Sequence, residues 1–416
     1  MSSTESPTSA SAESTREADV LVIGAGPAGS ATAWWLARAG ARVILTDRAR
    51  FPRDKPCSEY MGPGAVARLD RLGVTAALWA RGARSLEGTR VVAAHGASLT
   101  GLFAQNGAAG PNAGISLART ELDAALLDHA RSAGVRVREE HTAIDLVKDQ
   151  HGVRGARFRT PGGGEIAIQA RVTIGADGLR SIVARRIGGL EYGAPHRVGF
   201  VTHVAGVTQL GRTAEMLVSD AGYVGINPLG QDVANVALVV PRERARAARG
   251  RAEAFFLDEL RRFPGLADRI PAAGLLHPVH ATGPFSARAR RVVADGALLV
   301  GDAADFFDPF TGEGIFSALA GAEMAAAAVL SALESPGPVT ARRLGSYVKS
   351  RRRAFRGKWA VERLIGFGML APRLFDRAVA RLGRRGRMAH TLIGVTADVL
   401  PARRVLNPVF LARMVV

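Results

Sequence analysis

One stretch near the start of the chain, GAGPAG at residues 24–29, constrains the fold more than any other feature. It follows the apolar run DVLVI (19–23), which is typical of a buried parallel strand. A helical pattern, SATAWWLARAG, comes next and ends on Gly40, and a second apolar run, ARVILTD, ends on Asp47. Strand, glycine turn, helix and strand within about thirty residues predict a Rossmann-type βαβ unit, and therefore an α/β fold that binds a dinucleotide.

Each glycine of this turn has a specific task in such a unit. Gly24 permits the tight turn, Gly26 leaves room for a pyrophosphate, and Gly29 lets the helix pack close to the strand. The helix N-terminus then offers unpaired N–H groups and a positive dipole to the phosphates. The expected contacts in this loop are Gly24, Gly26, Pro27, Ala28 and Gly29.

An acidic residue follows at the spacing that ribose binding requires. Asp47 lies 18 residues beyond Gly29, near the usual spacing of about 20. Its carboxylate is suited to a pair of ribose hydroxyls, and an acid there favours an adenosine ribose without a 2′-phosphate. We include the neighbouring Arg48 in the same predicted site.

Two further polar turns decide which dinucleotide is bound. IGADGLRSIVARR (174–186) and GDAADFFDPFTGEGI (301–315) each follow an apolar strand. NAD needs one such loop, whereas the longer FAD must be held at both ends, so we expect FAD. A helix starting at the last turn would direct its N–H groups at the N1–C2=O edge of the flavin, and Asp302 would accept hydrogen bonds from the ribityl hydroxyls. The expected contacts are Asp177, Gly178, Asp302, Pro309, Gly312, Glu313, Gly314 and Ile315.

Together, the three motifs resemble those of the para-hydroxybenzoate-hydroxylase-like flavoproteins, a group that includes geranylgeranyl reductases and flavin halogenases. The resemblance covers roughly residues 18–335. It implies an FAD-dependent oxidoreductase, with NADPH or NADH as reductant docking without a second Rossmann domain. It also implies that Arg119, in ARTELDAALLDHA, lies against the FAD. The alternative for Arg119 is a surface ion pair, which we consider less favoured than a role at the FAD.

The segment RDKPCSEYMGPGA (53–65) looks most like the geranylgeranyl reductase branch. This resemblance implies that Cys57 lies close to the isoalloxazine, where it would tune or gate the active site. The alternative is a small buried apolar residue, which most free cysteines are. Arg53 and Lys55 either offset negative charge on phosphate or reduced flavin, or are solvated.

The expected domain organisation is discontinuous. A Rossmann-like FAD-binding domain holds an inserted substrate domain with a mostly antiparallel β-sheet, and a helical region follows at the C-terminus. The expected boundaries are 1–17 for a disordered leader, 18–84, 115–190 and 281–335 for the FAD-binding domain, 85–114 and 191–280 for the substrate domain, and 336–416 for a basic helical region.

The substrate sheet bears on the reaction. Prenyl reductases of this group carry a Tyr-x-Trp-x-Phe-Pro stretch, and GYVGINPLG (222–230) keeps only Tyr223 and Pro228 of it. The halogenase motif Trp-x-Trp-x-Ile-Pro is absent as well. By elimination we expect a monooxygenase that hydroxylates a hydrophobic phenolic or polyketide-derived lipid, with Cys57 and Tyr223 as candidate catalytic residues. The alternatives are a geranylgeranyl reductase-like enzyme that reduces isoprenoid double bonds, and a membrane-associated flavin-binding adaptor without turnover.

Charge is concentrated at the C-terminus. Residues 342–416 hold 18 Lys and Arg against three acids, a net charge of +15 out of +18 for the chain. Three interpretations remain open: a solvated helical cap, a face that contacts anionic membrane lipids, and nucleic-acid binding, which is disfavoured because no recognised module accompanies the charge. Pro372 is expected to break or kink this region.

The remaining composition places the protein in a cell compartment and bears on metals. The single cysteine allows no disulfide framework, so we expect a cytoplasmic protein, peripheral at a membrane if the tail binds one. The apolar run 316–333 contains Glu323 and many alanines, and predicts a packed helix rather than a membrane span. The nine histidines show no metal-ligand spacing, and no metal is expected.

Overall fold

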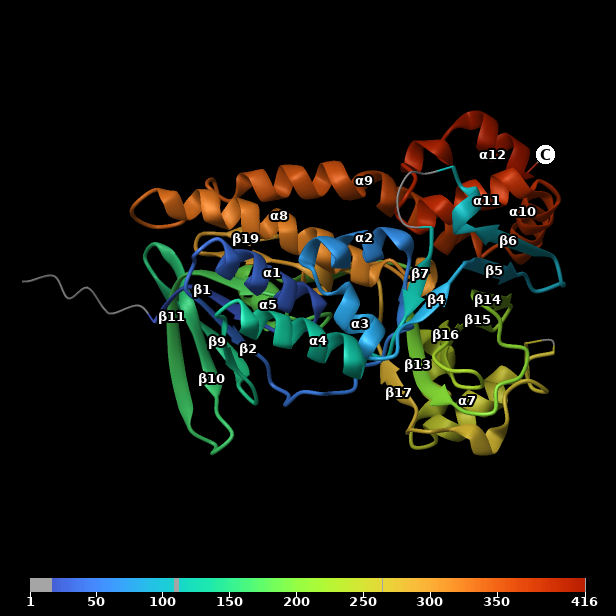
Figure 1. Ribbon diagram of the computed structural model, residues 1–416, viewed down its shortest axis with the longest axis horizontal. Helices are drawn as coiled ribbons and strands as arrows, with labels where there is room; N and C mark the ends of the chain where they lie inside the picture. The colour runs from blue at the N-terminus through green and yellow to red at the C-terminus, as the bar shows by residue number, and fades with distance from the viewer. Residues whose placement is uncertain (1–16, 108–111, 264, 416) are drawn as a thin grey trace, which may run out of the picture.

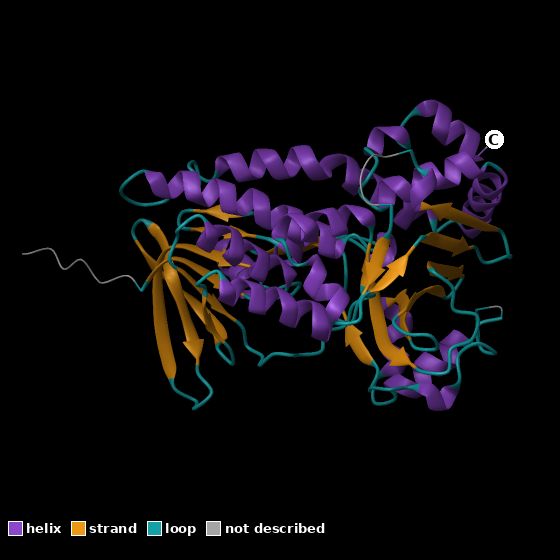
Figure 2. Cartoon of the chain, viewed as in Figure 1, coloured by secondary structure: helices purple, strands orange, loops and turns teal. Residues whose placement is uncertain are grey.

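The computed structural model describes residues 17–107, 112–263 and 265–415, so all of the predicted leader except its last residue lies outside the described part. The chain forms two β-sheet bodies side by side, with long helices running along one of them (Figures 1 and 2).

The first sheet contains the predicted Rossmann unit. Its backbone order is β19-β20-β11-β1-β2-β8, parallel except for β19, and β9 and β10 extend it through β11. The strands are β1 (Ala18–Ile23), β2 (Val43–Thr46), β8 (Arg136–Arg138), β9 (Thr142–Asp149), β10 (Gly152–Arg159), β11 (Glu165–Gly175), β19 (Val293–Ala294) and β20 (Ala297–Leu299). The central strands are buried on both faces, as their continuous apolar runs predict.

Helices cover both faces of this sheet. Two of them, α4 (Arg119–Ser132) and α8 (Gly314–Glu334), pack against α1 (Pro27–Arg38), and the three helices bury the largest apolar core. The short helix α5 (Ile182–Ile187) contributes to a second core on the opposite face. By length and composition α8 is apolar enough to cross a membrane, but 61% of its most apolar window is buried inside the protein.

The second sheet is the predicted antiparallel one. Its order is β17-β13-β16-β15-β14-β5-β6, and only the β14–β5 pair is parallel. The strands are β5 (Gly88–Val92), β6 (Ser98–Leu102), β13 (Arg197–Val204), β14 (Thr213–Ser219), β15 (Gly222–Pro228), β16 (Ala234–Pro241) and β17 (His280–Thr282). Helix α7 (Ala252–Leu260) packs its two phenylalanines into this sheet, and α6 (Arg242–Ala245) precedes it.

The chain also contains two three-stranded sheets, separate from the two large ones, and a pair of short helices. The strands of the small sheets are β3 (Tyr60–Met61), β7 (Gly114–Ser116) and β4 (Arg84–Leu86) in one, and β12 (Leu190–Tyr192), β18 (Ala287–Ala289) and β21 (Asp305–Phe306) in the other. The helices are α2 (Pro63–Leu72) and α3 (Thr75–Ala80).

The C-terminal region is helical, and its helices lie on different parts of the protein. Helix α9 (Gly345–Gly368) runs along α8, whereas α10 (Pro372–Arg384) and α11 (Gly386–Thr396) pack against β6 and α12 (Pro408–Val415) packs against α10 (Figure 1). The break predicted at Pro372 is confirmed, because this proline begins α10. The expected fold class, a Rossmann-like sheet with a second antiparallel sheet and a helical C-terminal region, is confirmed as well.

Candidate functional site

The glycine turn has the geometry that a phosphate loop requires. Gly24 has a φ of +100°, and a Cβ on it would lie 2.4 Å from the carbonyl oxygen of Ala176. A Cβ on Gly29 would lie 1.7 Å from the carbonyl oxygen of Gly24, so both positions exclude any side chain. Helix α1 then begins at Pro27 with no side-chain cap, which leaves its first N–H groups available to an anion.

Asp47 lies directly beyond the end of β2 and also braces the glycine turn. Its Oδ2 accepts a hydrogen bond of 2.7 Å from the backbone N–H of Ala25, and its Oδ1 accepts one of 2.9 Å from Ala49. A carboxylate has further lone pairs for a ribose hydroxyl, so the predicted role stays open. The neighbouring Arg48 is exposed.

Three cationic side chains converge in front of the glycine turn. A Cβ on Gly26 would meet Arg53 Nη2 at 3.6 Å and Arg119 Nη2 at 3.8 Å, and a Cβ on Gly178 would meet Lys55 Nζ at 3.3 Å. Burial lowers the pKa of Lys55, and the positive charge of Arg119 lowers it further. The cluster therefore has the electrostatics of a site that receives an anion such as a pyrophosphate.

Arg119 belongs to a buried ion pair, so the surface ion pair considered from the sequence is wrong. Its side chain donates to both carboxylate oxygens of Asp123, at 2.8 and 2.7 Å, and the residue is only 5% exposed. Burial by itself would lower the pKa of Arg119, but the charge of Asp123 and the nearby Cys57 sulfur outweigh it and raise the pKa. The same Asp123 lies 3.1 Å from Arg53 Nη1.

The middle motif forms a turn at the end of β11. Asp177 Oδ2 accepts a 2.6 Å hydrogen bond from the backbone N–H of Ile182, and Ser181 caps α5. The other oxygen, Oδ1, is buried with no hydrogen-bond partner among the described residues. Burial raises the pKa of Asp177. A buried acceptor without a donor fits a ligand that supplies hydroxyl groups.

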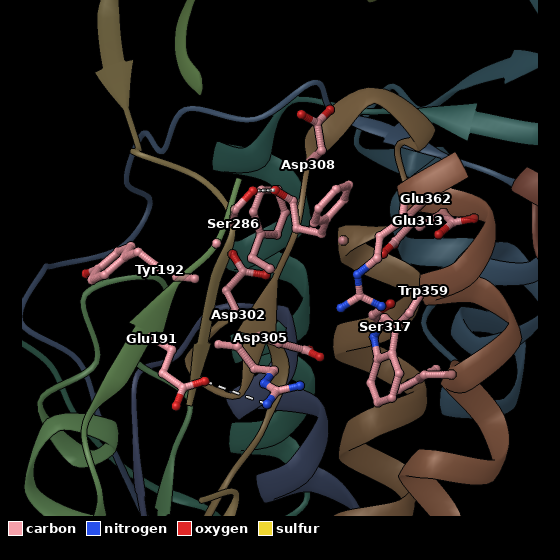
Figure 3. Close-up of a pocket in the computed structure, with 18 of the residues that line it drawn as sticks. Glu191, Tyr192, Ser286, Asp302, Asp305, Asp308, Glu313, Ser317, Trp359 and Glu362 are labelled. Carbon is pink, nitrogen blue, oxygen red and sulfur yellow. Dashed lines mark hydrogen bonds and ion pairs between the residues drawn. The ribbon is translucent and has the colours of Figure 1, made fainter. Parts of the chain in front are cut away.

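The third motif borders a cavity of about 270 Å³. Asp302 and Asp305 line one wall, and Glu313, Ser317 and Trp359 line the side formed by α8 and α9 (Figure 3). Burial raises the pKa of Asp302, although Lys55 and Arg119 oppose that effect. Asp302 thus belongs both to this cavity and to the surroundings of the cationic cluster.

The turn before α8 is shaped as predicted. A short 3-10 turn, Pro309–Thr311, is followed by Gly312 with a φ of +69°, and α8 starts at Gly314 with no side-chain cap. A Cβ on Gly312 would lie 2.4 Å from the Tyr60 ring. Glu313 stands immediately before the helix, and Ile315 is buried in the core beneath it.

Cys57 lies half-buried in a loop that the second sheet holds in place. Its Sγ accepts a hydrogen bond of 3.3 Å from the Glu59 N–H. The side-chain amides of Asn235 and Asn227 donate to the carbonyl oxygens of Cys57 (2.8 Å) and Ser58 (2.9 Å). The loop thus joins the two sheet bodies, and a role of Cys57 at the flavin stays a prediction.

Sequence reasoning missed Glu59, which links the two bodies by its side chain. Its Oε2 lies 2.7 Å from His203 Nε2 on β13, and its Oε1 accepts a 2.7 Å hydrogen bond from the backbone N–H of Arg119. Burial would lower the pKa of His203, but the hydrogen bond and charge of Glu59 outweigh it and raise the pKa. The partners are 144 residues apart, so no local pattern indicates them.

Tyr223 lies in the core rather than on the wall of the described cavity. It is 2% exposed, its ring packs edge-on against Phe310, and its hydroxyl donates to Asp308 Oδ1 at 2.6 Å. Asp308 also accepts a 2.7 Å hydrogen bond from Arg197 Nη1. These contacts were not expected from the sequence, and they give Tyr223 a structural role.

The donors and acceptors fit FAD. The glycine turn and the three cations suit a pyrophosphate, Asp177 and Asp302 suit hydroxyl groups, and the uncapped α8 suits the electron-rich edge of a flavin. Fold and site thus define a dinucleotide-dependent flavoprotein. A family model described as an FAD binding domain matches residues 17–361, and the chain belongs to this family.

Curated relatives narrow the class to FAD-dependent oxidoreductases. The menaquinone reductase of Mycolicibacterium smegmatis is 32% identical over 315 residues, which cover 72% of this chain and 73% of the relative. The digeranylgeranylglycerophospholipid reductase of Methanothrix thermoacetophila is 32% identical over 330 residues, covering 76% and 78%. Both are reductases, so the comparisons favour the reductase alternative over the hydroxylase that the sequence motifs led us to expect.

Solved structures support the fold alone. A flavoprotein/dehydrogenase from Cytophaga hutchinsonii has a TM-score of 0.80 at 21% identity, covering 91% of this chain and 92% of that one. The myxobacterial chondrochloren halogenase has a TM-score of 0.78 at 23% identity, covering 92% and 97%. Since a halogenase shares the architecture, the fold does not select the reaction.

Proposed function

We propose that this protein is an FAD-dependent reductase that saturates carbon–carbon double bonds in the isoprenoid chain of a lipid-like substrate, with NADPH or NADH as the source of electrons. The observation that carries the proposal is the pair of reductase relatives, each 32% identical across more than two thirds of this chain. The name of one of them specifies a lipid with geranylgeranyl chains. The segment around Cys57, which resembles that of the geranylgeranyl reductase branch, supports it.

The residues of this chain bind and orient the cofactor in this proposal. Arg53, Lys55 and Arg119 hold the pyrophosphate at the start of α1, and Asp302 accepts hydrogen bonds from the ribityl chain. The α8 N-terminus stabilises negative charge on the flavin. When bound, FAD supplies hydride transfer.

Saturation of a double bond also consumes a proton, and His203 is a suitable reservoir for it. The Glu59 carboxylate keeps a proton on the His203 ring over a wider pH range. The pair lines a small space together with Lys55 and Cys57, and the exposed His277 and His280 lie on its outer side. We therefore propose that protons reach the active site from solvent through His203.

A monooxygenase is the second candidate, and a specific substitution favours it. Gly225 and Asn227 stand where the prenyl reductase stretch has tryptophan and phenylalanine. The side chain of Asn227 donates a hydrogen bond to the Ser58 carbonyl oxygen. At this position of the sheet, the protein therefore has a side chain that holds the Cys57–Ser58 loop, whereas the prenyl reductase motif has an aromatic ring. A protein lacking those rings could accept a different hydrophobic substrate, including a phenolic or polyketide-derived lipid.

Rapid mixing of the reduced protein separates these functions. The reductase proposal predicts that a geranylgeranyl lipid reoxidises the flavin under strict anaerobiosis. A monooxygenase would need oxygen for the same reoxidation and would show an oxygenated flavin. A flavin-binding adaptor would show neither substrate-dependent reoxidation nor product.

A further inference from the structure

The corner between α9 and α10 carries a row of exposed apolar side chains. Leu364, Phe367, Leu370 and Leu374 are 37%, 45%, 60% and 44% exposed. They follow one another at spacings of three or four residues, the first three at the end of α9 and its turn and the last in the first turn of α10. Large apolar residues clustered in this way mark an interaction surface.

Helix α10 adds exposed positive charge beside this corner. Its outer face carries four arginines at spacings of three or four residues, and its inner face buries Val379 and Leu382 against β6. The four are Arg373, Arg377, Arg381 and Arg384, all exposed. None of them forms an ion pair with a described residue, whereas Asp376 on the same helix is paired with His95.

The corner is also connected to the cavity described above. Phe307 lines the cavity, and the centroid of its ring lies 6.0 Å from the centroid of the Phe367 ring at the corner. Arg363 also lines the cavity and precedes Leu364 directly in α9. A molecule held at the corner would therefore stand beside the cavity wall.

We propose that the α9–α10 corner docks on an anionic lipid bilayer. The four apolar side chains enter the boundary between headgroups and acyl chains, and the four arginines lie at the level of the phosphates. Charge complementarity selects this occupant, because an apolar tip bordered by exposed arginines matches both layers of such a surface. The docked corner sets the cavity wall against the membrane. This last step rests on the proposed function, since only a lipid substrate needs that route.

Flotation with lipid vesicles tests the surface directly. The full-length FAD-bound protein is mixed with phosphatidylcholine vesicles with or without phosphatidylglycerol. We expect binding only to the anionic vesicles, weakening as salt is added. Each arginine near an anionic surface contributes about fivefold to binding. The variant R373Q/R377Q/R381Q, which loses three of them, should therefore bind these vesicles about a hundredfold more weakly. The variant L370S/L374S should also lose at least about tenfold, while keeping the yellow flavin.

A matched control removes the same charge elsewhere. Arg352, Arg353 and Arg356 are exposed on α9 away from the corner, and none forms an ion pair with a described residue. R352Q/R353Q/R356Q should bind nearly as the unmodified protein does. Equal losses in both triple variants would overturn the proposal, as would equal binding to neutral vesicles. A vesicle-independent dimer that L370S/L374S abolishes would overturn it too, in favour of a second copy.

Two forms of the substrate separate membrane docking from the proposed reaction. Turnover of a short, water-soluble isoprenoid should be unchanged in L370S/L374S. Turnover of an isoprenoid chain that is carried by a lipid in anionic vesicles should fall in the same variant. Loss of vesicle binding without any effect on vesicle turnover would overturn the delivery route. Absence of turnover on either substrate, with vesicle binding intact, would contradict only the proposed function.

Discussion

The hydroxyl of Tyr223 on β15 donates a 2.6 Å hydrogen bond to Asp308, which lies in the turn that leads into α8. Arg197 on β13 bonds the same carboxylate at 2.7 Å, and all three side chains are buried. This contact fixes the antiparallel sheet against the turn that we assign to the flavin. Together with the links made by Glu59 and the Cys57–Ser58 loop, it sets the relative position of the two bodies.

Removing the Tyr223 hydroxyl should destabilise the protein. Tyr223→Phe should lower the free energy of unfolding by about 1 to 2 kcal/mol, because Asp308 loses one donor. Arg197→Met should cost about 3 to 5 kcal/mol, since it leaves a buried carboxylate without its cation. Urea unfolding measures both, and Tyr192→Phe, at an exposed position, is the control. A Tyr223→Phe variant of unchanged stability but abolished turnover would instead indicate a catalytic hydroxyl.

Lys55 should affect the apoprotein and the FAD-bound protein in opposite directions. Lys55→Met relieves the repulsion from Arg53 and Arg119, so the FAD-free protein should unfold at a higher temperature. The affinity for FAD should fall by about ten- to a hundredfold, because a charged donor to the pyrophosphate is lost. Fluorescence titration measures the affinity, and the exposed Arg50→Met is the control. Unchanged affinity would contradict the anion site.

The local parts of the site were predictable from sequence, and the distant contacts were not. Gly29 is confirmed as a steric necessity by Gly24, which lies within the same βαβ unit. Gly24 is restricted instead by Ala176, which stands far along the chain after β11, although the motif alone indicated a glycine there. Asp308 and Arg197 meet across 111 residues, and no period in either segment points to the other. The resemblance placed Arg119 against FAD, but its burial depends on tertiary packing. The reaction itself was inferred from two missing aromatic residues, and the relatives favour the other outcome.

The pair formed by His203 and Glu59 should make stability depend on pH. The folded pKa of His203 is raised, so the pair stabilises the protein fully below the usual histidine pKa of about 6.5 and loses that effect as pH rises through the folded value. Glu59→Gln should therefore be more destabilising at pH 6 than at pH 9 in urea unfolding. His151→Gln, at an exposed position, should show no such difference. A destabilisation independent of pH would contradict the charged pair.

The same pair should control proton supply in turnover. His203→Gln should lower kcat and remove the decline of kcat on the alkaline side of the pH profile, because the titrating group is gone. FAD affinity should be unaffected, since the cations that bind phosphate remain. An unchanged pH profile would assign His203 a purely structural role.

The ion pairs of Lys358 connect α9 with the start of α8 and with the segment after α11, and they should make stability depend on pH. Its Nζ lies 2.9 Å from Glu313 Oε2 and 2.6 Å from Asp398 Oδ1. Burial raises the pKa of both acids well above their usual values, so stability is lost as pH rises through the folded values and the acids ionise. Lys358→Met removes their counter-ion and should cost about 3 to 5 kcal/mol at pH 9, but less at pH 5. The exposed Lys349→Met serves as control in the same unfolding experiment, and equal losses at both pH values would contradict the network.

The product formed without oxygen decides whether this protein is an isoprenoid reductase. The purified yellow protein is given NADPH or NADH and a geranylgeranyl lipid under argon, and the lipid is analysed by mass spectrometry. An isoprenoid reductase should give a product heavier by two hydrogen atoms for each double bond reduced. An unchanged lipid under argon, together with a product that has gained one oxygen atom in air, would contradict the reductase proposal.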